Sequence, residues 1–574
     1  MRRLPLIAAV GAVCSMVVLP ATGSTAAAAA STVTGSYHGK AGSATRLTQA
    51  ATISSLPKVA SAFRNEGPRV FSPVRPHGPS SAGAAGAAAA GGSTMGGLNG
   101  VLGAFNGLSD LQSDNLNGFP VTPPDQGLCV GSDPTLAGRP KAVFEPINLA
   151  VRETSTQGTL LRPDVSLATL FADPFAEGDV RCLYDQQTRT FYFTEIGFPV
   201  ATGPAADDNN TTADVLVVNA HGAAAYQFDT SLGGPAAGDC FGDQPKAGFD
   251  NNALVISTDE YCGPTESNYE GAIALVISKP QLVAEDATVN DSVVGPVSLA
   301  GNPVVGMDPA IGTGTGRAYF VNSVPFLANG NNNPVGNTLG LWTLTNSAAV
   351  TTGSGTVTLT GTVLPSEPYA FPVPATSTGD GSVTDVNGTP VTSEATLNAD
   401  DSRLSGPVSV TRGPLGGIQL WTALDAAVTP RGDSTARDSA AWFQINVGSQ
   451  SIARQGYVTA RGAHLLYPAV GAPQFGSPVV VFTITSKTIN PSAAYTVLGS
   501  NRIRTVATGT DPHKSFSDVQ FDEARWGDYS FAQVDPSGLG IWLATEYIPP
   551  AADQDPLDNW GTYVFKVNQF SLGH

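Results

Sequence analysis

The sequence is poor in charged residues, and positive charge is scarcer than negative. Only 13% of the 574 residues are charged, and 29 Lys and Arg stand against 47 Asp and Glu, for a formal net charge of −18. Proteins that bind nucleic acid neutralise phosphates with clustered Lys and Arg. The composition therefore argues against a nucleic-acid partner, and the acidity indicates mainly solubility and a weak attraction for cations.

Histidine is also scarce, and the patterns of nucleophilic and zinc catalysis are missing. The chain has six His, and three of them lie in the low-complexity N-terminal region or at the last position. It contains no Gly-x-Ser-x-Gly motif, which marks the nucleophile of many hydrolases. No Cys-x-x-Cys spacing is present to indicate a zinc site. The sequence gives little support for a serine hydrolase, and a zinc site is only the alternative to disulfides for the cysteines.

Long apolar runs are missing beyond the N-terminus. Arg2 and Arg3 precede an apolar run over residues 4–19, and small residues follow. This order is typical of a secretory signal peptide, which we assign to residues 1–28, with cleavage between Ala21 and Ala30. A retained membrane anchor is the alternative, but the run is short for a spanning helix. We expect a secreted, extracellular protein with no membrane span after cleavage.

Glycine and proline are abundant, at 64 and 43 residues. Such a composition favours many short strands and turns over long helices. Residues 29–115 are rich in Ala, Gly, Ser and Pro, and we predict a disordered linker or pro-region there. Residues 116–574 are predicted to form one all-β domain, because strand-like segments alternate with turn residues to the end.

One phrase occurs twice, far apart in the chain. The sequence GDQP at 242–245 is followed by Glu260 and Tyr261, and GDYS at 527–530 is followed by Glu546 and Tyr547. Both copies have the pattern of a strand, a turn containing Asp and a second strand. Copies at such a distance indicate a repeated β-unit.

Weaker copies lie between and before these two. Their turns are expected near residues 133, 185, 250, 308, 414, 474 and 535. Most intervals correspond to a four-stranded propeller blade. We predict a β-propeller of seven blades. The segment 351–401 is predicted to be an inserted loop or extra strands. The count is eight if this segment contains a further blade, and six if the first copy is not a true repeat.

The last copy has only three convincing strands, which predicts a ring closed by the other end of the domain. A free sheet edge is a liability that closure removes. Residues 101–117 are the candidates for the missing strand.

Four cysteines remain after removal of the signal peptide, an even number that favours disulfides in an exported chain. Cys240 and Cys262 bracket one strand–turn–strand unit, and Cys129 and Cys182 occupy similar places in successive units. We predict the pairs Cys129–Cys182 and Cys240–Cys262.

The repeat also brings acidic residues together at one end of the inner hairpins. Pairing across a hairpin places Asp243 near Glu260, and Asp528 near Glu546. Similar positions around this mouth give a set of candidate binding residues: Asp125, Asp179, Asp243, Trp526, Asp528 and Tyr529.

These carboxylates have three interpretations. They hold neighbouring blades together, or they bind a cation such as Ca²⁺ through hard oxygen ligands. The third is acid–base chemistry on a sugar by Asp243, Glu260, Asp528 or Glu546, because paired carboxylates serve glycosidases and raise each other's pKa. The sequence requires no metal or other cofactor, and Ca²⁺ is the alternative.

The phrases PPDQG at 123–127, GDQP at 242–245 and RWGDY at 525–529 resemble those of exported bacterial sialidase-like β-propeller proteins, most without an assigned activity. The resemblance implies a propeller over about residues 120–570. The Ser-x-Asp-x-Gly-x-Thr-Trp box of sialidases is not found. Our hypothesis is a secreted, monomeric propeller that binds an extracellular glycan or protein without catalysis. The alternative is a glycoside hydrolase-like enzyme, so the sequence leaves open whether the protein is an enzyme.

Overall fold

The structure is a computed structural model. It describes residues 33–47, 70–71, 100–173, 178–197, 211–230, 240–262, 268–324, 335–378, 382–384, 390–392, 396–500, 502–515 and 524–570. The predicted signal peptide and most of the predicted linker lie outside these residues.

The described part of the chain is almost entirely β-structure, as predicted. Its helical segments are α1 (Asp110–Asn117), α2 (Leu167–Phe171), α3 (Lys279–Ala284), α4 (Ala349–Thr352) and the 3-10 turn η2 (Ala551–Asp553). No described helix has the length and apolar character needed to cross a bilayer. Short helices and many strands are what abundant Gly and Pro favour.

The strands form successive groups of four that pair antiparallel in the order given below, and we call these groups blades. Blade 1 has β6 (Cys129–Ser132), β7 (Lys141–Ile147), β8 (Ala150–Ser155) and β9 (Val165–Ser166). Blade 2 has β10 (Gly178–Asp185), β11 (Thr190–Gly197), β12 (Thr212–Asn219) and β13 (Gly222–Asp229). Blade 3 has β14 (Cys240–Phe249), β15 (Ala253–Cys262), β16 (Asn268–Ser278) and β17 (Thr288–Leu299). Blade 4 has β19 (Asp308–Pro309), β20 (Ala318–Ser323), β21 (Val335–Thr345) and β22 (Thr358–Ala370).

The second half of the domain repeats this order. Blade 5 has β27 (Ser409–Arg412), β28 (Ile418–Val428), β29 (Arg437–Asn446) and β30 (Ser451–Val458). Blade 6 has β31 (His464–Gly471), β32 (Val479–Ser486), β33 (Ile489–Val497) and β34 (Ile503–Ala507). Blade 7 has β35 (Phe531–Val534), β36 (Ile541–Tyr547), β37 (Gly561–Val567) and β4 (Val101–Ser109).

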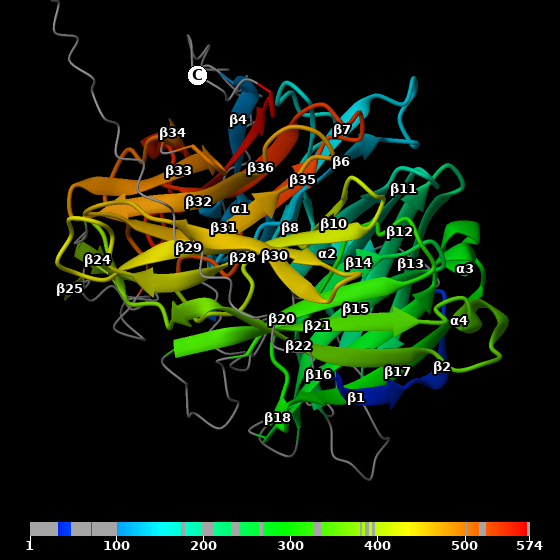
Figure 1. The fold of residues 1–574 in the computed structure, drawn as a ribbon. Helices are drawn as coiled ribbons and strands as arrows, with labels where there is room; N and C mark the ends of the chain where they lie inside the picture. The colour runs from blue at the N-terminus through cyan, green and yellow to red at the C-terminus, as the bar shows by residue number, and fades with distance from the viewer. Residues whose placement is uncertain are drawn as a thin grey trace, which may run out of the picture. The chain divides into compact units, whose positions relative to one another are not determined.

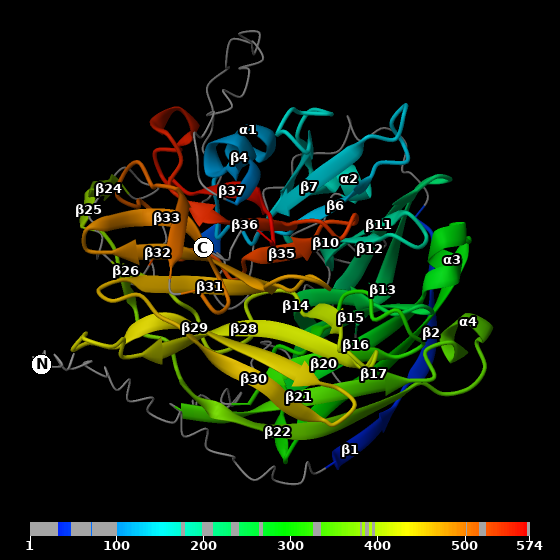
Figure 2. The same ribbon diagram turned by 45° about the horizontal axis from the view of Figure 1, so that its top comes forward.

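The blades follow one another around a common centre (Figures 1 and 2). An apolar cluster packs between each blade and the next. A further cluster, with Val130 of β6 and Trp542 of β36, packs between blades 1 and 7. Because the last blade packs against the first, the sheets form a closed β-propeller. The count of seven stays a prediction, since pairing of Ala370 with Ala427 joins blades 4 and 5 into one sheet.

The strand that completes blade 7 comes from the N-terminal side of the domain, as predicted. β4 pairs antiparallel with β37, with Phe105 opposite Val564 and Ser109 opposite Gly561. The pairing covers the backbone groups that β37 would otherwise leave open at a sheet edge. Both predicted disulfides are present: Cys129–Cys182 links β6 to β10, and Cys240–Cys262 links β14 to β15.

Two regions differ from the sequence prediction. Within the predicted disordered segment 29–115, β1 (Val33–His38) pairs with β22, β2 (Lys40–Thr45) pairs with β17, and β4 pairs with β37, so the domain begins before residue 116. Gly and Ser interrupt both segments, VTGSYH and KAGSAT, which weakens their strand signal, and existing sheet edges supply their hydrogen-bond partners. The predicted insertion 351–401 starts too early, because α4 and β22 belong to blade 4.

The remaining short strands lie outside the blades. They are β3 (Val70–Phe71) with β5 (Val121–Thr122), β18 (Asn302–Pro303) beside β17, β23 (Ala375–Thr376) with β26 (Thr396–Leu397), and β24 (Ser382–Thr384) with β25 (Pro390–Thr392).

Candidate functional site

The turns between the first two strands of several blades are closed by a buried Asp. The carboxylates of Asp133, Asp185, Asp250 and Asp535 each accept a hydrogen bond from the backbone N–H two residues later, at 2.6–2.9 Å. Asp is favoured at this turn position because its short carboxylate can accept a hydrogen bond from the backbone two residues later. The repeated turn Asp is therefore part of the blade structure.

At the opposite end of the inner hairpins, the repeated Gly makes room for the repeated Glu. Gly242 lies opposite Glu260 in the strand register, and Asp243 lies opposite Asp259. A Cβ atom on Gly242 would lie 3.0 Å from Glu260 Oε1, and one on Gly527 would lie 2.5 Å from Glu546 Oε1. The two copies of the phrase thus have the same packing, with a glutamate side chain beside the glycine backbone.

Bulges in the inner strands turn side chains toward the centre of the ring. The register shifts between Asp243 and Lys246 in β14 and at matching points in β10 and β31. Three non-glycine residues at these points have positive φ, between 49° and 52°: Asp179, Gln244 and Tyr467; Asp125, which precedes β6, has a φ of 45°. A bulge re-aims side chains in this way. The sequence pointed to the two Asp but not to Gln244 and Tyr467, whose residue types carry no such signal.

All six candidate binding residues are buried. Asp125, Asp179, Asp243, Trp526, Asp528 and Tyr529 have exposed fractions of 7% or less. The predicted catalytic candidates Glu260 and Glu546 have none. Trp526 donates from its indole N–H to Thr483 Oγ1 at 3.1 Å, so its ring packs between blades and does not project from a rim.

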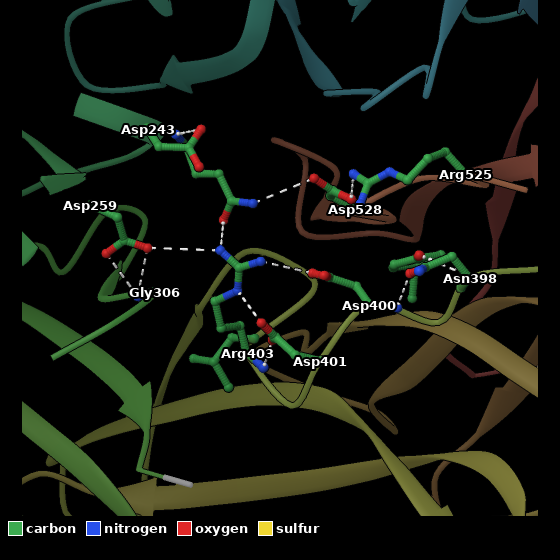
Figure 3. A network of polar contacts seen from close by, with 12 residues as sticks. Asp243, Asp259, Gly306, Asn398, Asp400, Asp401, Arg403, Arg525 and Asp528 are labelled. Carbon is green, nitrogen blue, oxygen red and sulfur yellow. Dashed lines mark hydrogen bonds and ion pairs between the residues drawn. The ribbon is translucent and has the colours of Figure 1, made fainter. Parts of the chain in front are cut away.

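Arg403 lies at the centre of a polar network that includes two of the candidate carboxylates (Figure 3). Its guanidinium contacts Asp401 at 2.7 Å and Asp400 at 3.0 Å. It also donates to Gln244 Oε1 at 2.8 Å and lies 3.9 Å from Asp259 Oδ2.

The network continues from Gln244 to the second copy of the phrase. Gln244 Nε2 donates to Asp528 Oδ2 at 3.4 Å, and Asp528 Oδ1 pairs with Arg525. Segments of blades 3 and 7 and the connection before β27 therefore meet here. No sequence signal pointed to Arg403, Asp400 or Asp401, because they lie at or just beyond the end of the predicted insertion and in no repeated position.

Burial dominates the protonation of these acids. It raises the pKa of Asp528, although Arg525 opposes the shift. It raises the pKa of Asp401 to about 7, against the attraction of Arg403. Burial also acts on Asp400, but Arg403 and Arg525 hold the pKa of that carboxyl below its usual value. Burial raises the pKa of Glu260 to about 8 and places that of Glu546 well above its usual value.

Little space is left beside these side chains. A cavity of about 20 Å³ is lined by Arg181, Lys246, Asp308 and Tyr529, among others. A second, of about 10 Å³, borders Gln244, Asp400, Arg403 and Asp528. One water needs roughly 10–15 Å³ of such volume. The cavities beside the network hold about one water each, and neither admits a sugar ring. In the part of the chain that is described, no group of three or more His, Cys, Asp or Glu is arranged to hold a metal ion.

The raised pKa of Glu260 predicts a pH dependence of stability. Glu titrates near 4.3 in an unfolded chain, so between about pH 5 and about pH 8 the folded protein retains a proton that the unfolded chain releases. Rising pH then favours unfolding through this group. In Glu260→Gln, we expect the fall in the free energy of unfolding over this range to be shallower by up to about 1.4 kcal/mol per pH unit.

Urea unfolding at several pH values measures this effect. Glu270→Gln, an exposed position in the adjacent strand β16, is the matched control and should retain the wild-type slope. An unchanged slope in Glu260→Gln would show that this side chain is not a buried neutral acid.

No protein-family model and no curated protein matches the sequence. Solved structures with similarity include a GH43_1 enzyme from Xanthomonas citri, at 12% identity and a TM-score of 0.27, covering 58% of this chain and 90% of that one. A PL25 ulvan lyase aligns at 10% identity and a TM-score of 0.36, covering 82% and 94%. The GH93 α-L-arabinofuranosidase of Fusarium graminearum aligns at 9% identity and a TM-score of 0.31, covering 77% and 92%. Similarity at this level carries no information on activity, and the fold assignment rests on the strand order. The sialidase-like resemblance of the sequence stays a prediction.

Proposed function

We propose that this chain is a secreted, monomeric β-propeller that binds an extracellular glycan or protein without catalysis. The mouth at the glycine–glutamate end of the inner hairpins is the proposed binding end. The observation that carries this proposal is the packing of the central acids: their side chains are buried and the adjacent cavities are water-sized.

A glycosidase needs different geometry. Its two carboxyl groups flank the scissile bond, with a sugar between them and a water as well in inverting enzymes. Here Asp528 is held by Arg525 and Gln244, and Gly242 and Gly527 leave room only for the glutamates themselves. The hydrolase alternative would require these contacts to break before substrate entered.

The same contacts suit a binding module. Arg403 and Gln244 join segments of several blades through short polar contacts, which holds the mouth loops in one arrangement. A preorganised surface loses less conformational freedom when a ligand binds.

A glycan array combined with a hydrolysis screen on the purified protein tests the proposal. We expect binding without turnover, and we expect Asp528→Asn to weaken binding because it loosens the mouth. Asp286→Asn, at an exposed turn on the other end of the hairpins, is the control and should bind as wild type. Turnover that Asp528→Asn abolishes while binding persists would establish the enzyme instead.

A further inference from the structure

The connections of a blade alternate between the two ends of its strands. The loop between the first and second strands and the loop between the third and fourth lie at the same end in an antiparallel sheet. We call this end the turn face. In blades 5, 6, 7 and 1 its described residues are 413–417, 447–450, 472–478, 498–500, 502, 535–540, 568–570, 100–102, 133–140 and 156–164.

Most exposed apolar side chains of the described chain lie on this face. Eight large apolar side chains are exposed among the described residues, and six belong to the turn face: Leu102, Leu160, Leu415, Phe475, Leu539 and Phe570. Leu415 is fully exposed and Phe475 is 73% exposed. Single exposed hydrophobic residues are normal. Their concentration on neighbouring blades at one face marks an interaction surface.

Hydrogen bonds hold the loops that carry these side chains. Arg412 N–H donates to Gln474 Oε1 at 2.8 Å, and Gln474 Nε2 donates to the Arg412 carbonyl at 2.9 Å, next to Leu415 and Phe475. Gln569 joins the next two loops, since its side chain contacts the backbone of Gly538 and Gly540 and its carbonyl accepts from Ser477. The apolar tips therefore keep fixed relative positions.

The exposed charge on the turn face is mainly positive, although the whole chain is acidic. Exposed arginines lie at the turns of five blades: Arg139, Arg189, Arg317, Arg412 and Arg502. Within the described residues none of them forms an ion pair with a carboxylate. Most acids at this end are buried, as Asp535 is between Lys141 and Lys566, whereas Asp286 is exposed.

We propose that the turn face binds the surface of a membrane that contains anionic lipids. Leu and Phe tips enter the boundary between headgroups and acyl chains, and arginine guanidinium groups contact lipid phosphates. Each basic residue near an anionic bilayer adds to the attraction. Exposed arginines beside the apolar tips complement anionic headgroups, and this charge complementarity favours an anionic bilayer as the partner. Bound in this way, the protein would present its mouth away from the membrane.

Flotation with vesicles tests this inference on the full chain. The probe is a set of vesicles of phosphatidylcholine with phosphatidylglycerol, and a second set of phosphatidylcholine alone. We expect the wild type to bind the anionic vesicles more tightly, and salt to weaken that binding. The double variant Leu415→Ser/Phe475→Ser should lose about tenfold or more in affinity, because two apolar side chains no longer leave water.

Matched variants separate this effect from others. Val335→Ser replaces an exposed apolar residue at the opposite end of the strands, and it should bind as wild type. The Val335→Ser control and the double variant have the same N-terminus. Any contribution of the N-terminal apolar run to vesicle binding is therefore equal in the two proteins and cancels when their affinities are compared. The double variant Arg189→Glu/Arg502→Glu should lose affinity for anionic vesicles only.

Three results would overturn the proposal. The first is that the wild type does not float with anionic vesicles. The second is that the Leu415→Ser/Phe475→Ser variant floats as well as Val335→Ser. The third is self-association in sedimentation velocity that the apolar double variant abolishes, which would assign the face to a second copy of the chain. Equal melting temperatures of the variants confirm that the comparison concerns the surface and not the fold.

Discussion

Replacing Arg403 with Met will lower the free energy of unfolding by about 3–5 kcal/mol, the usual cost of removing one partner from a buried ion pair. The Arg403 guanidinium is the cation shared by Asp400 and Asp401, and its side chain is only 13% exposed. Met fills much of the same volume, so the loss would come from charge and hydrogen bonding rather than from a cavity. Urea unfolding at neutral pH measures the change.

The neighbouring residues explain why the effect should be large. Without Arg403, Gln244 Oε1 loses the donor that now lies at 2.8 Å, and Asp400 and Asp401 remain as two adjacent buried acids. Such acids either take up protons or repel one another. Loss of Arg403 removes the attraction that opposes the effect of burial on the pKa of both acids, so their pKa rises in the folded variant. The variant should therefore regain part of its stability as the pH falls toward about 3.9, the pKa of Asp in an unfolded chain.

Two control variants make this result specific. Arg403→Lys keeps the charge but lacks the forked donors of arginine, so it should lie between wild type and Arg403→Met. Arg317→Met removes an exposed arginine and should leave stability within about 0.5 kcal/mol. A loss below about 1 kcal/mol in Arg403→Met would contradict a structural role for the network.

Deleting the chain through residue 118 should abolish cooperative folding. The deletion removes β4, leaves β37 as an open edge and removes several contacts to blades 1 and 7. Leu108, which is fully buried, donates from its N–H to Glu145 Oε2 at 2.9 Å and accepts from Thr562 at 2.9 Å. Asn106 accepts from the Tyr547 hydroxyl at 2.8 Å.

The expected magnitude follows from the marginal stability of domains. A domain is stable by about 5–15 kcal/mol in total, and the lost strand combines apolar burial with a full ladder of hydrogen bonds. The open edge of β37 would also offer a template for association. Circular dichroism melting and size-exclusion chromatography should show a broad transition and aggregates.

A shorter deletion is the matched control. A chain lacking residues 1–99 loses β1 and β2 as well but retains β4, so the difference between the two deletions isolates residues 100–118. The shorter deletion should melt cooperatively. If both deletions melt at the same temperature, β4 does not close the ring.

The repeated phrase carried much of the fold prediction. Its strand–turn–strand pattern, the spacing of Asp133, Asp185, Asp250 and Asp535, and the three-stranded last copy pointed to blades and to closure by residues 101–117. These features are local, because a turn Asp bonds to its own backbone two residues later. The two disulfides followed from the same repeat.

The candidate site was harder to predict from the sequence than the fold was. Alignment of the copies indicated Asp125, Asp179, Asp243 and Asp528, but it could not tell a ring of exposed carboxylates from a buried one. Arg403 reaches that ring from a connection of irregular sequence, and Gln244 reaches it through a bulge. Neither position has a periodic signal, since each depends on how distant segments meet.

By itself, then, the sequence determined an all-β repeat domain, its closing strand and its cysteine pairs, because turns, strand alternation and repeat spacing are local or periodic properties. Only the tertiary structure decided that the repeated acids are buried around Arg403 and Arg525, and that exposed Leu, Phe and Arg share the turn face. Those properties arise where blades meet around an axis, so the residues that create them are neighbours in space and remote in the chain.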